Sequence, residues 1–248
     1  MSRSMWSPAP PTLSLARNDV HVWRAPLEQR DEVQERFLRT LDRDERQRAD
    51  RFHFEKHRRR FIVGRGFLRF LLGLYLEIPP EEVRFAYGPY GKPSLAGEHD
   101  ASRLRFNASH SHELAIYGFV QDHEIGVDVE YSQAEFAGED IARHFFSAYE
   151  IEQLMALPEG ERGAAFFRCW TRKEAYIKAF GSGLSHPLDQ FDVSLAPSEP
   201  AALIRDYRDA QATSRWSMFN LELEGYAGAV VVESVSVIGV RTFDCPTL

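Results

Sequence analysis

The proline-free stretch from Phe166 to Leu184 most constrains the fold, because its apolar side chains recur at helical spacing. Two glycines near its end, Gly181 and Gly183, are typical of the C-terminal end of a helix. At a period of about 3.6 residues the apolar side chains form one stripe. The stripe contains Phe166, Phe167, Trp170, Ile177 and Phe180. The pattern predicts a helix from Ala164 to Phe180 that packs against the rest of the chain.

An acidic residue, Glu174, lies inside this apolar stripe, with Lys173 and Lys178 on its two edges. A glutamate is rarely buried without a partner. One interpretation is an i,i+4 pair between Glu174 and Lys178, which contributes only a few tenths of a kcal/mol. The other is a carboxylate held in a cleft for a metal ion, with lysines placed for phosphate. The stretch alone leaves both open.

The composition limits the classes of protein that this sequence can encode. The 248 residues allow one large domain or two smaller ones, and the net charge of −7 argues against a general nucleic-acid coat. Cys169 and Cys245 are the two cysteines, too few for a disulfide framework or a cysteine zinc site. Neither a signal peptide nor a membrane span is apparent. We therefore expect a cytoplasmic protein that binds neither membrane nor nucleic acid.

A basic segment stands out in the first third of this acidic chain. Residues 46–69 carry nine Lys and Arg against Asp50 and Glu55, with apolar residues interleaved. We expect one amphipathic helix that runs to about Leu76 and is closed by Pro79 and Pro80. The arginines are interpreted either as a solvated face or as a local field that attracts phosphates.

The segment Ile125–Tyr131 alternates strictly, as expected for a β-strand. Asp128 and Glu130 share one face with Gly126, roughly 7 Å apart along the strand. This face is interpreted either as an ordinary solvent-exposed surface or as a pair of oxygen ligands for Mg²⁺, which typically takes one or two protein carboxylates.

The remaining pattern predicts two similar halves. Each half carries a long helix followed by several strands, which indicates an α+β fold with halves at residues 1–121 and 122–248. The length and this two-part layout predict a monomer in which one chain supplies the whole site. Further helices are expected at Leu27–Leu41, Ile141–Phe146 and Tyr149–Leu157, and strands at Val20–Trp23, Val83–Tyr87, Leu104–Ala108, Leu114–Val120, Phe191–Leu195, Trp216–Leu223 and Ala227–Ile238.

Five ordered motifs over roughly residues 45–195 give the sequence a family resemblance. They are Gly91-Lys92-Pro93, Phe106-Asn107-Ala108-Ser109-His110-Ser111, Gly126-Val127-Asp128-Val129-Glu130, Phe145-Phe146-Ser147 and Trp170 through Leu184. Together they resemble the 4′-phosphopantetheinyl transferases in their long, Sfp-type form.

The resemblance implies a pseudo-twofold arrangement of the two halves, with coenzyme A in the cleft between them. It implies a transfer of phosphopantetheine from coenzyme A to a serine of an apo acyl or peptidyl carrier protein, releasing 3′,5′-adenosine bisphosphate. The implied cofactor is Mg²⁺, with Mn²⁺ as the alternative. The carrier protein and its pathway stay open.

The resemblance also implies roles for individual residues. The implied metal ligands are Asp128, Glu130 and Glu174. Catalysis is assigned to Glu174, a candidate base, and to Lys178. Coenzyme A contacts are assigned to Arg48, Arg60, Gly91, Lys92, Ser109, His110, Lys173 and Lys178: the two lysines of the long helix for the pyrophosphate, His110 and Arg60 for the 3′-phosphate, and Gly91 and Lys92 for the adenine side.

Two residues depart from the pattern of the family. Val129, between the strand carboxylates, cannot coordinate a metal. Glu45 stands where some relatives carry a lysine, whereas Arg48 can still bind phosphate.

Two rival functions stay open. A Mg²⁺-dependent hydrolase of nucleotide pyrophosphates would need the same carboxylates and lysines but no protein acceptor. A nucleic-acid binder would use the basic segment, although no recognised nucleic-acid motif supports it.

Overall fold

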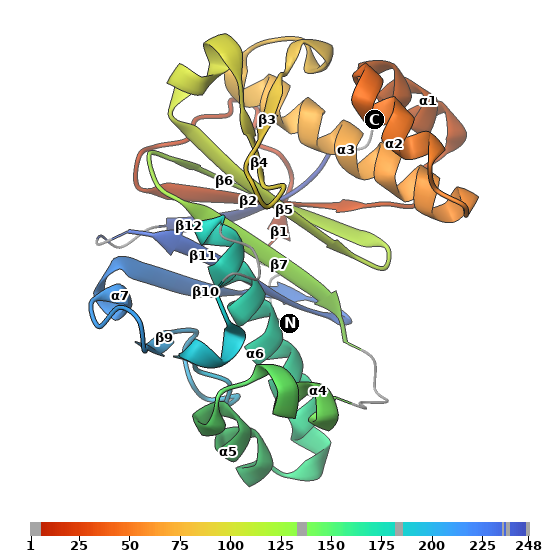
Figure 1. Ribbon diagram of the computed structural model, residues 1–248. Helices are drawn as coiled ribbons and strands as arrows, with labels where there is room; N and C mark the ends of the chain where they lie inside the picture. The colour runs from red at the N-terminus through yellow and green to blue at the C-terminus, as the bar shows by residue number, and fades with distance from the viewer. Residues whose placement is uncertain (1–5, 133–137, 182–185, 235, 237–238, 247–248) are drawn as a thin grey trace.

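The computed structural model describes residues 6–132, 138–181, 186–234, 236 and 239–246. Helices and strands are mixed in two halves that each pack a long helix on a sheet (Figure 1). The predicted α+β fold is therefore confirmed. None of the helices in these residues is long and apolar enough to cross a membrane.

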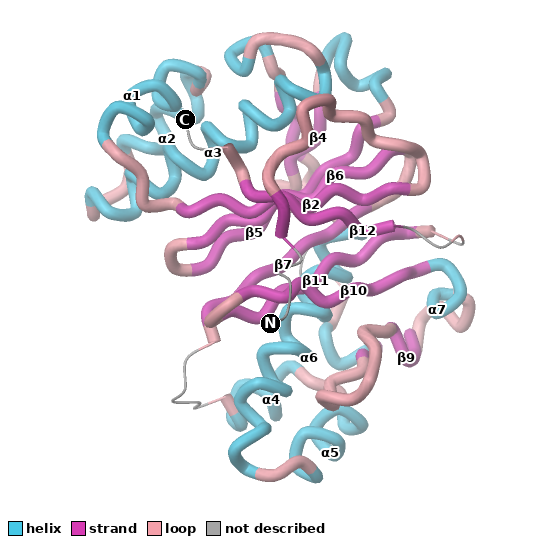
Figure 2. The backbone as a smooth tube through the Cα atoms, turned by 180° about the vertical axis from the view of Figure 1, so that it is seen from behind, coloured by secondary structure: helices cyan, strands magenta, loops and turns pink. Residues whose placement is uncertain are grey.

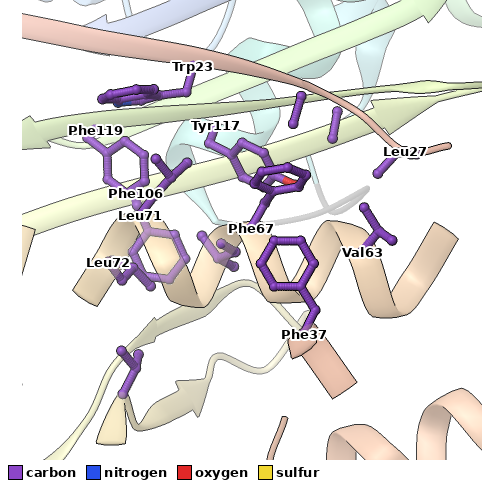
Figure 3. Packing of buried hydrophobic residues seen from close by; sticks show 14 of the residues in the cluster. Trp23, Leu27, Phe37, Val63, Phe67, Leu71, Leu72, Phe106, Tyr117 and Phe119 are labelled. Atoms are coloured by element: carbon purple, nitrogen blue, oxygen red, sulfur yellow. The ribbon is translucent and has the colours of Figure 1, made fainter. Parts of the chain in front are cut away.

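The N-terminal half is built on strand β2 (Asp19–Pro26) and the hairpin of β5 (Leu104–Ser111) and β6 (Leu114–Gln121). Three helices precede the hairpin: α1 (Asp31–Thr40), α2 (Arg43–Asp50) and α3 (Glu55–Leu76). Figure 3 shows Phe67, Leu71 and Leu72 of α3 packed beneath the aromatic side chains of the sheet. Short elements β3 (Phe85–Tyr87), β4 (Pro93–Leu95) and the 3₁₀ turns Pro80–Glu82 and Gly97–Ser102 lie between helix and hairpin.

The C-terminal half repeats this order of elements. Strand β7 (Ile125–Tyr131) is followed by α4 (Glu139–Phe145), α5 (Ala148–Ala156) and α6 (Glu159–Phe180). After the short elements Leu188–Gln190, β8 (Phe191–Val193), β9 (Leu203–Asp206) and α7 (Ala212–Arg215) comes the hairpin of β10 (Trp216–Leu223) and β11 (Tyr226–Glu233). The strand orders β2-β6-β5 and β7-β11-β10 correspond to one another.

Two strands from the ends of the described chain extend the first sheet. Strand β12 (Gly239–Asp244) runs parallel to β2, and β1 (Trp6–Ser7) runs parallel to β12. The last strand thus joins the sheet of the first half, although it belongs by sequence to residues 122–248. The division of the chain at residue 122 stays a proposal.

Each half has a buried basic side chain on its long helix, held in the same way. In α3, Arg69 donates to the Glu45 carboxylate at 2.7 Å; in α6, Lys173 pairs with Glu150 at 2.8 Å. Each glutamate belongs to a capping box at the start of the preceding helix, and each cation also donates to two main-chain carbonyls. The repetition is therefore structural as well as topological.

The structure corrects two details of the predicted elements. The basic segment is not one helix: a capping box between Asp42 and Glu45 starts α2, and residues 51–54 separate it from α3. The face of β7 that carries Asp128 is not exposed to solvent, because α6 covers it. Valines on the opposite face are buried between the two sheets, so β7 is buried on both sides.

Candidate active site between the two halves

The candidate site lies where α6 crosses β7, beside the edge strand β5. Figure 2 shows β7 next to β5, with β11 and β10 beyond it. Gly126 permits this close packing, because a Cβ there would overlap the Ala175 carbonyl oxygen and lie 2.5 Å from the Ala179 nitrogen. The glycine therefore fixes how deeply α6 sits over the strand carboxylates.

One lysine connects the two halves at the centre of the site. The Lys178 ammonium donates to Asp128 Oδ1 at 2.5 Å and to Ser109 Oγ at 3.1 Å. The Ser109 hydroxyl donates to the same Asp128 oxygen at 2.8 Å. Asp128 is 2 % exposed, and burial raises the pKa of its carboxyl although Lys178 and Ser109 act in the opposite direction. Lys178 thus pairs with Asp128 of β7 instead of with Glu174 along the helix, and its contact with Ser109 reaches the other half.

Two further carboxylates stand close to Asp128. Burial, and then the negative charge of Asp128, raise the pKa of Glu174. Burial also raises the pKa of Glu130, which Asp128 raises further and a hydrogen bond from Ser111 lowers. The three predicted metal ligands are therefore within electrostatic reach of one another, and a cation between them would relieve their repulsion.

The donor set fits a hard divalent cation. Asp128 Oδ2 is buried and has no hydrogen-bond partner among the described residues. In the same part of the chain, no three His, Cys, Asp or Glu side chains are grouped closely enough to hold a metal ion unaided. Mg²⁺ suits such a site, since it usually takes one or two carboxylates and completes its shell with water and phosphate oxygens.

Positive charges converge on His110 from both halves. Desolvation, and then the charges of Lys178, Arg48 and Arg60, lower the pKa of His110, while Asp128 opposes them. Part of His110 is nevertheless accessible to solvent. The predicted phosphate contacts on α2, α3, β5 and α6 are therefore brought to one region.

The two arginines of this region are held differently. Arg60 is paired with Glu28 at 2.9 Å and with Glu113 at 3.2 Å, so a phosphate would have to compete with two carboxylates. Arg48 is exposed and lies 5.2 Å from the Phe61 ring centre, and no carboxylate pairs with it in the described residues. Arg48 is thus the more available of the two for an anion.

Lys92 joins the halves but does not present a free charge. Its ammonium donates to the Ala179 carbonyl at 2.7 Å, at the end of α6, and pairs with Glu124 at 2.9 Å. Gly91 adopts φ +80° in the preceding turn, a conformation that glycine tolerates. A cavity of about 260 Å³ lies beside the turn, bordered by Lys92, Pro93, Phe106 and Gly181.

Lys173 does not join this site, and its predicted role as a pyrophosphate contact does not fit the structure. The side chain is 0 % exposed. Its ammonium is bound by Glu150 and by the carbonyls of Leu188 and Phe191 at 2.7 and 2.6 Å. The corresponding Arg69 does the same in the first half. A helical wheel treats Lys173 and Lys178 alike, but tertiary packing separates them.

Sequence reasoning assigned no individual role to two polar residues of the second motif that hold β5 against β7. Asn107 Oδ1 accepts the Val127 main-chain N–H at 2.9 Å, and the Ser111 hydroxyl donates to Glu130 at 2.7 Å. Asn107, Ser109 and Ser111 alternate along β5, so the strand periodicity of polar residues was a usable signal. Residues 182–185, which include the predicted Gly183-Leu184 end of the last motif, lie outside the described residues.

Comparison with known proteins identifies the family. Residues 124–231 match the 4′-phosphopantetheinyl transferase superfamily, and residues 25–118 match the family described as 4′-phosphopantetheinyl transferase, N-terminal. The chain is 42% identical over 221 residues to 4′-phosphopantetheinyl transferase HetI of Nostoc sp., covering 89% of this chain and 90% of that protein. It is 34% identical over 170 residues to 4′-phosphopantetheinyl transferase Sfp of Bacillus subtilis, covering 68% and 72%.

A solved structure, the Chronobacterium ammoniagenes ACPS-CoA complex, aligns with 45% of this chain and 97% of its own, at 17% identity and a TM-score of 0.35. The relatives named above extend over most of the chain and across both halves of the candidate site. The chain therefore belongs to the 4′-phosphopantetheinyl transferase family.

Proposed function

We propose that this chain transfers the 4′-phosphopantetheine group of coenzyme A to a serine hydroxyl of an apo acyl or peptidyl carrier protein. The observation that carries the proposal is the cluster of Lys178, Asp128 and Ser109, with Glu130 and Glu174 beside it. The Lys178 ammonium and three carboxylates lie near the interface of the two halves, which supports transfer from a pyrophosphate. Family membership supports the same reaction.

The binding of coenzyme A is proposed to follow the positive charges. Lys178, His110 and Arg48 surround one region, which would attract a ligand with several phosphate charges. The 3′-phosphate is assigned to His110 and Arg48. Arg60 could bind it only after its ion pairs with Glu28 and Glu113 are broken. The adenine is assigned to the cavity beside Gly91. There it would contact bordering side chains such as Pro93 and Phe106 and not the Lys92 ammonium.

Mg²⁺ is proposed as the cofactor, held by Asp128, Glu130 and Glu174. When bound, it would neutralise the pyrophosphate oxygens and make the phosphorus a better electrophile. The buried and unpartnered Asp128 Oδ2 supports this assignment. Mn²⁺ would suit the same oxygen ligands.

The proposed reaction is one displacement at phosphorus. The carrier serine oxygen bonds to the phosphorus that bears the pantetheine group. The bond from this phosphorus to the bridging oxygen breaks, and its electron pair leaves with 3′,5′-adenosine bisphosphate. Lys178 stabilises negative charge on the phosphate oxygens. Glu174 is the proposed base for the serine proton, because burial and Asp128 raise its pKa.

The state and location of the protein are proposed on separate grounds. A monomer is supported because the residues of the site, such as Lys178 and Ser109, come from both halves of one chain. A cytoplasmic location is supported by the two free thiols, Cys169 and Cys245, since a reducing compartment keeps such groups unpaired.

The decisive experiment incubates the purified chain with coenzyme A, MgCl₂ and an apo carrier protein, and follows the carrier by intact-mass spectrometry. The carrier should gain one phosphopantetheine group, whereas a carrier whose acceptor serine is replaced by alanine should gain none. Glu174→Gln and Lys178→Met should slow the reaction with unchanged circular dichroism. Release of phosphopantetheine without a carrier would instead indicate a pyrophosphate hydrolase, and salt-dependent RNA binding without transfer would indicate the nucleic-acid alternative.

A further inference from the structure

The two halves meet at two strands that share no main-chain ladder. Strand β5 is the edge of one sheet and β7 the edge of the other. The strands run in the same direction, and side chains of β5 take the place of the missing main-chain bonds. The Asn107 side chain accepts the N–H of Val127, and the Ser111 hydroxyl accepts the N–H of Tyr131 at 3.1 Å.

The same side chains reach the carboxylates of β7. Ser109 donates to Asp128 Oδ1 at 2.8 Å, and Ser111 donates to Glu130 Oε2 at 2.7 Å. Because both strands have a period of two, each serine faces one carboxylate. Ser111 is therefore held on both sides: its oxygen accepts from the main chain of β7, and its proton points to Glu130.

The internal repeat provides a comparison within the molecule. The hairpin β5–β6 closes with the pair Ser111 and Leu114, and the hairpin β10–β11 closes with Leu223 and Tyr226. Both hairpins have two-residue loops, so Ser111 corresponds to Leu223. Two positions earlier, Ser109 corresponds by the same count to a leucine at position 221.

The carboxylates of β7 are absent from the corresponding strand β2, just as the serines of β5 are absent from β10. Strand β7 pairs Tyr131 with the first residue of β11, and β2 pairs Pro26 with the first residue of β6. By that register Asp128 corresponds to Trp23 and Glu130 to Ala25. Serine and carboxylate thus occur together where β5 meets β7, and apolar residues replace both in the corresponding strands β10 and β2.

We propose that Ser111 is a positioning residue, which fixes the Glu130 carboxylate by one oxygen and leaves the other for the divalent cation. The inference rests on the proposed transferase function and on the proposed metal ligands. A partner that orients a metal ligand in this way typically affects metal affinity or activity by about 10- to 100-fold when it is removed.

An isosteric pair of substitutions tests the hydroxyl at constant shape. Ser111→Thr keeps the hydroxyl and Ser111→Val replaces it by a methyl group, and both residues suit a strand. Ser111→Val should lower Mn²⁺ affinity, measured by electron paramagnetic resonance without coenzyme A, by about 10- to 100-fold, and should lower kcat similarly. Ser111→Thr should stay near wild type. The control Ser7→Ala removes a serine of the edge strand β1 that donates to the Thr242 carbonyl, and it should change neither quantity.

A double-mutant cycle separates positioning from general stability. In a Glu130→Ala background, Ser111→Val should cause little further loss of Mn²⁺ affinity, because the carboxylate it positions is gone. Equal Mn²⁺ affinity and kcat in the Thr and Val variants would overturn the inference, as would the same loss from Ser111→Val with and without Glu130. Absence of transfer by the wild-type chain would refute the proposed function instead, whereas the Mn²⁺ measurements would still judge the role of Ser111.

Discussion

Replacement of Lys173 by methionine distinguishes a structural from a phosphate-binding role for this lysine. Its ammonium is fully buried, 2.8 Å from Glu150, and it also binds two carbonyl oxygens. Lys173→Met keeps most of the apolar stem but leaves the Glu150 charge buried without its partner. Loss of one member of a buried ion pair costs about 3–5 kcal/mol. For a chain of this size, that corresponds to a fall in melting temperature of about 6–20 °C.

The assay is urea unfolding followed by tryptophan fluorescence, with coenzyme A affinity measured by calorimetry on the folded protein. We expect the unfolding free energy to fall and the coenzyme A dissociation constant to stay within about threefold, which is below 1 kcal/mol. Arg69→Met is the matched control, because Arg69 holds Glu45 in the same way in the other half. It should destabilise the chain to a similar extent.

A double substitution tests whether the unpaired Glu150 charge causes the loss of stability. Replacing both members of the pair, Lys173→Met with Glu150→Met, removes the unpaired charge and should recover part of the lost stability. A tenfold weaker coenzyme A affinity in Lys173→Met, with less than about 1 kcal/mol of lost stability, would refute this reasoning and restore the phosphate contact expected from the sequence.

Three further predictions concern other residues that position the site or the core. Burial, and then Arg241, lower the pKa of His21 from 6.5 to about 4, so the unfolded chain takes up the proton first. The free energy of unfolding should therefore fall by about 3 kcal/mol as the pH is lowered from 6.5 to 4. The His21→Phe variant should not show this part of the decrease in urea titrations at each pH. Gly126→Ala should cost about 1–3 kcal/mol in the same assay and slow transfer, because α6 must move away from β7. Lys92→Met should lower the melting temperature and kcat more than Lys92→Arg does, because Lys92 binds the end of α6; equal values would contradict this role.

The strands of the site could be predicted because their signal is local. Strict alternation placed β7 at Ile125–Tyr131, which are its bounds in the structure. The same alternation put Asp128 and Glu130 on one face. The sequence did not reveal that this face is covered, since the cover is α6, whose packing depends on contacts between distant segments. The choice between a solvated face and a buried site therefore needed the tertiary structure.

The roles of the lysines could not be predicted for a related reason. On a helical wheel, Lys173 and Lys178 occupy equivalent edges of the stripe. Burial of Lys173 depends on Glu150 of α5 and on carbonyls before and within β8, and the partner of Lys178 comes from β7. Each assignment thus depends on a segment at least fifteen residues away. Motif order selected the candidate residues, and the tertiary contacts show which partners each of them has.

The corresponding edge strands of the two halves differ in what lies beside them. The edge of β7 faces polar side chains of β5, which bind its carboxylates together with Lys178. The corresponding strand β2 carries Trp23 where β7 carries Asp128, and its edge is paired with β12 over Asp19–Arg24. The Trp6 indole of β1 donates to the main-chain carbonyl of Glu222 on β10 and so links this side of the first sheet to the second half. An apolar strand edge can be covered by another strand in this way, whereas carboxylates buried without a partner would be costly. The difference therefore leaves the polar edge of β7 as the one suited to the proposed charged substrate.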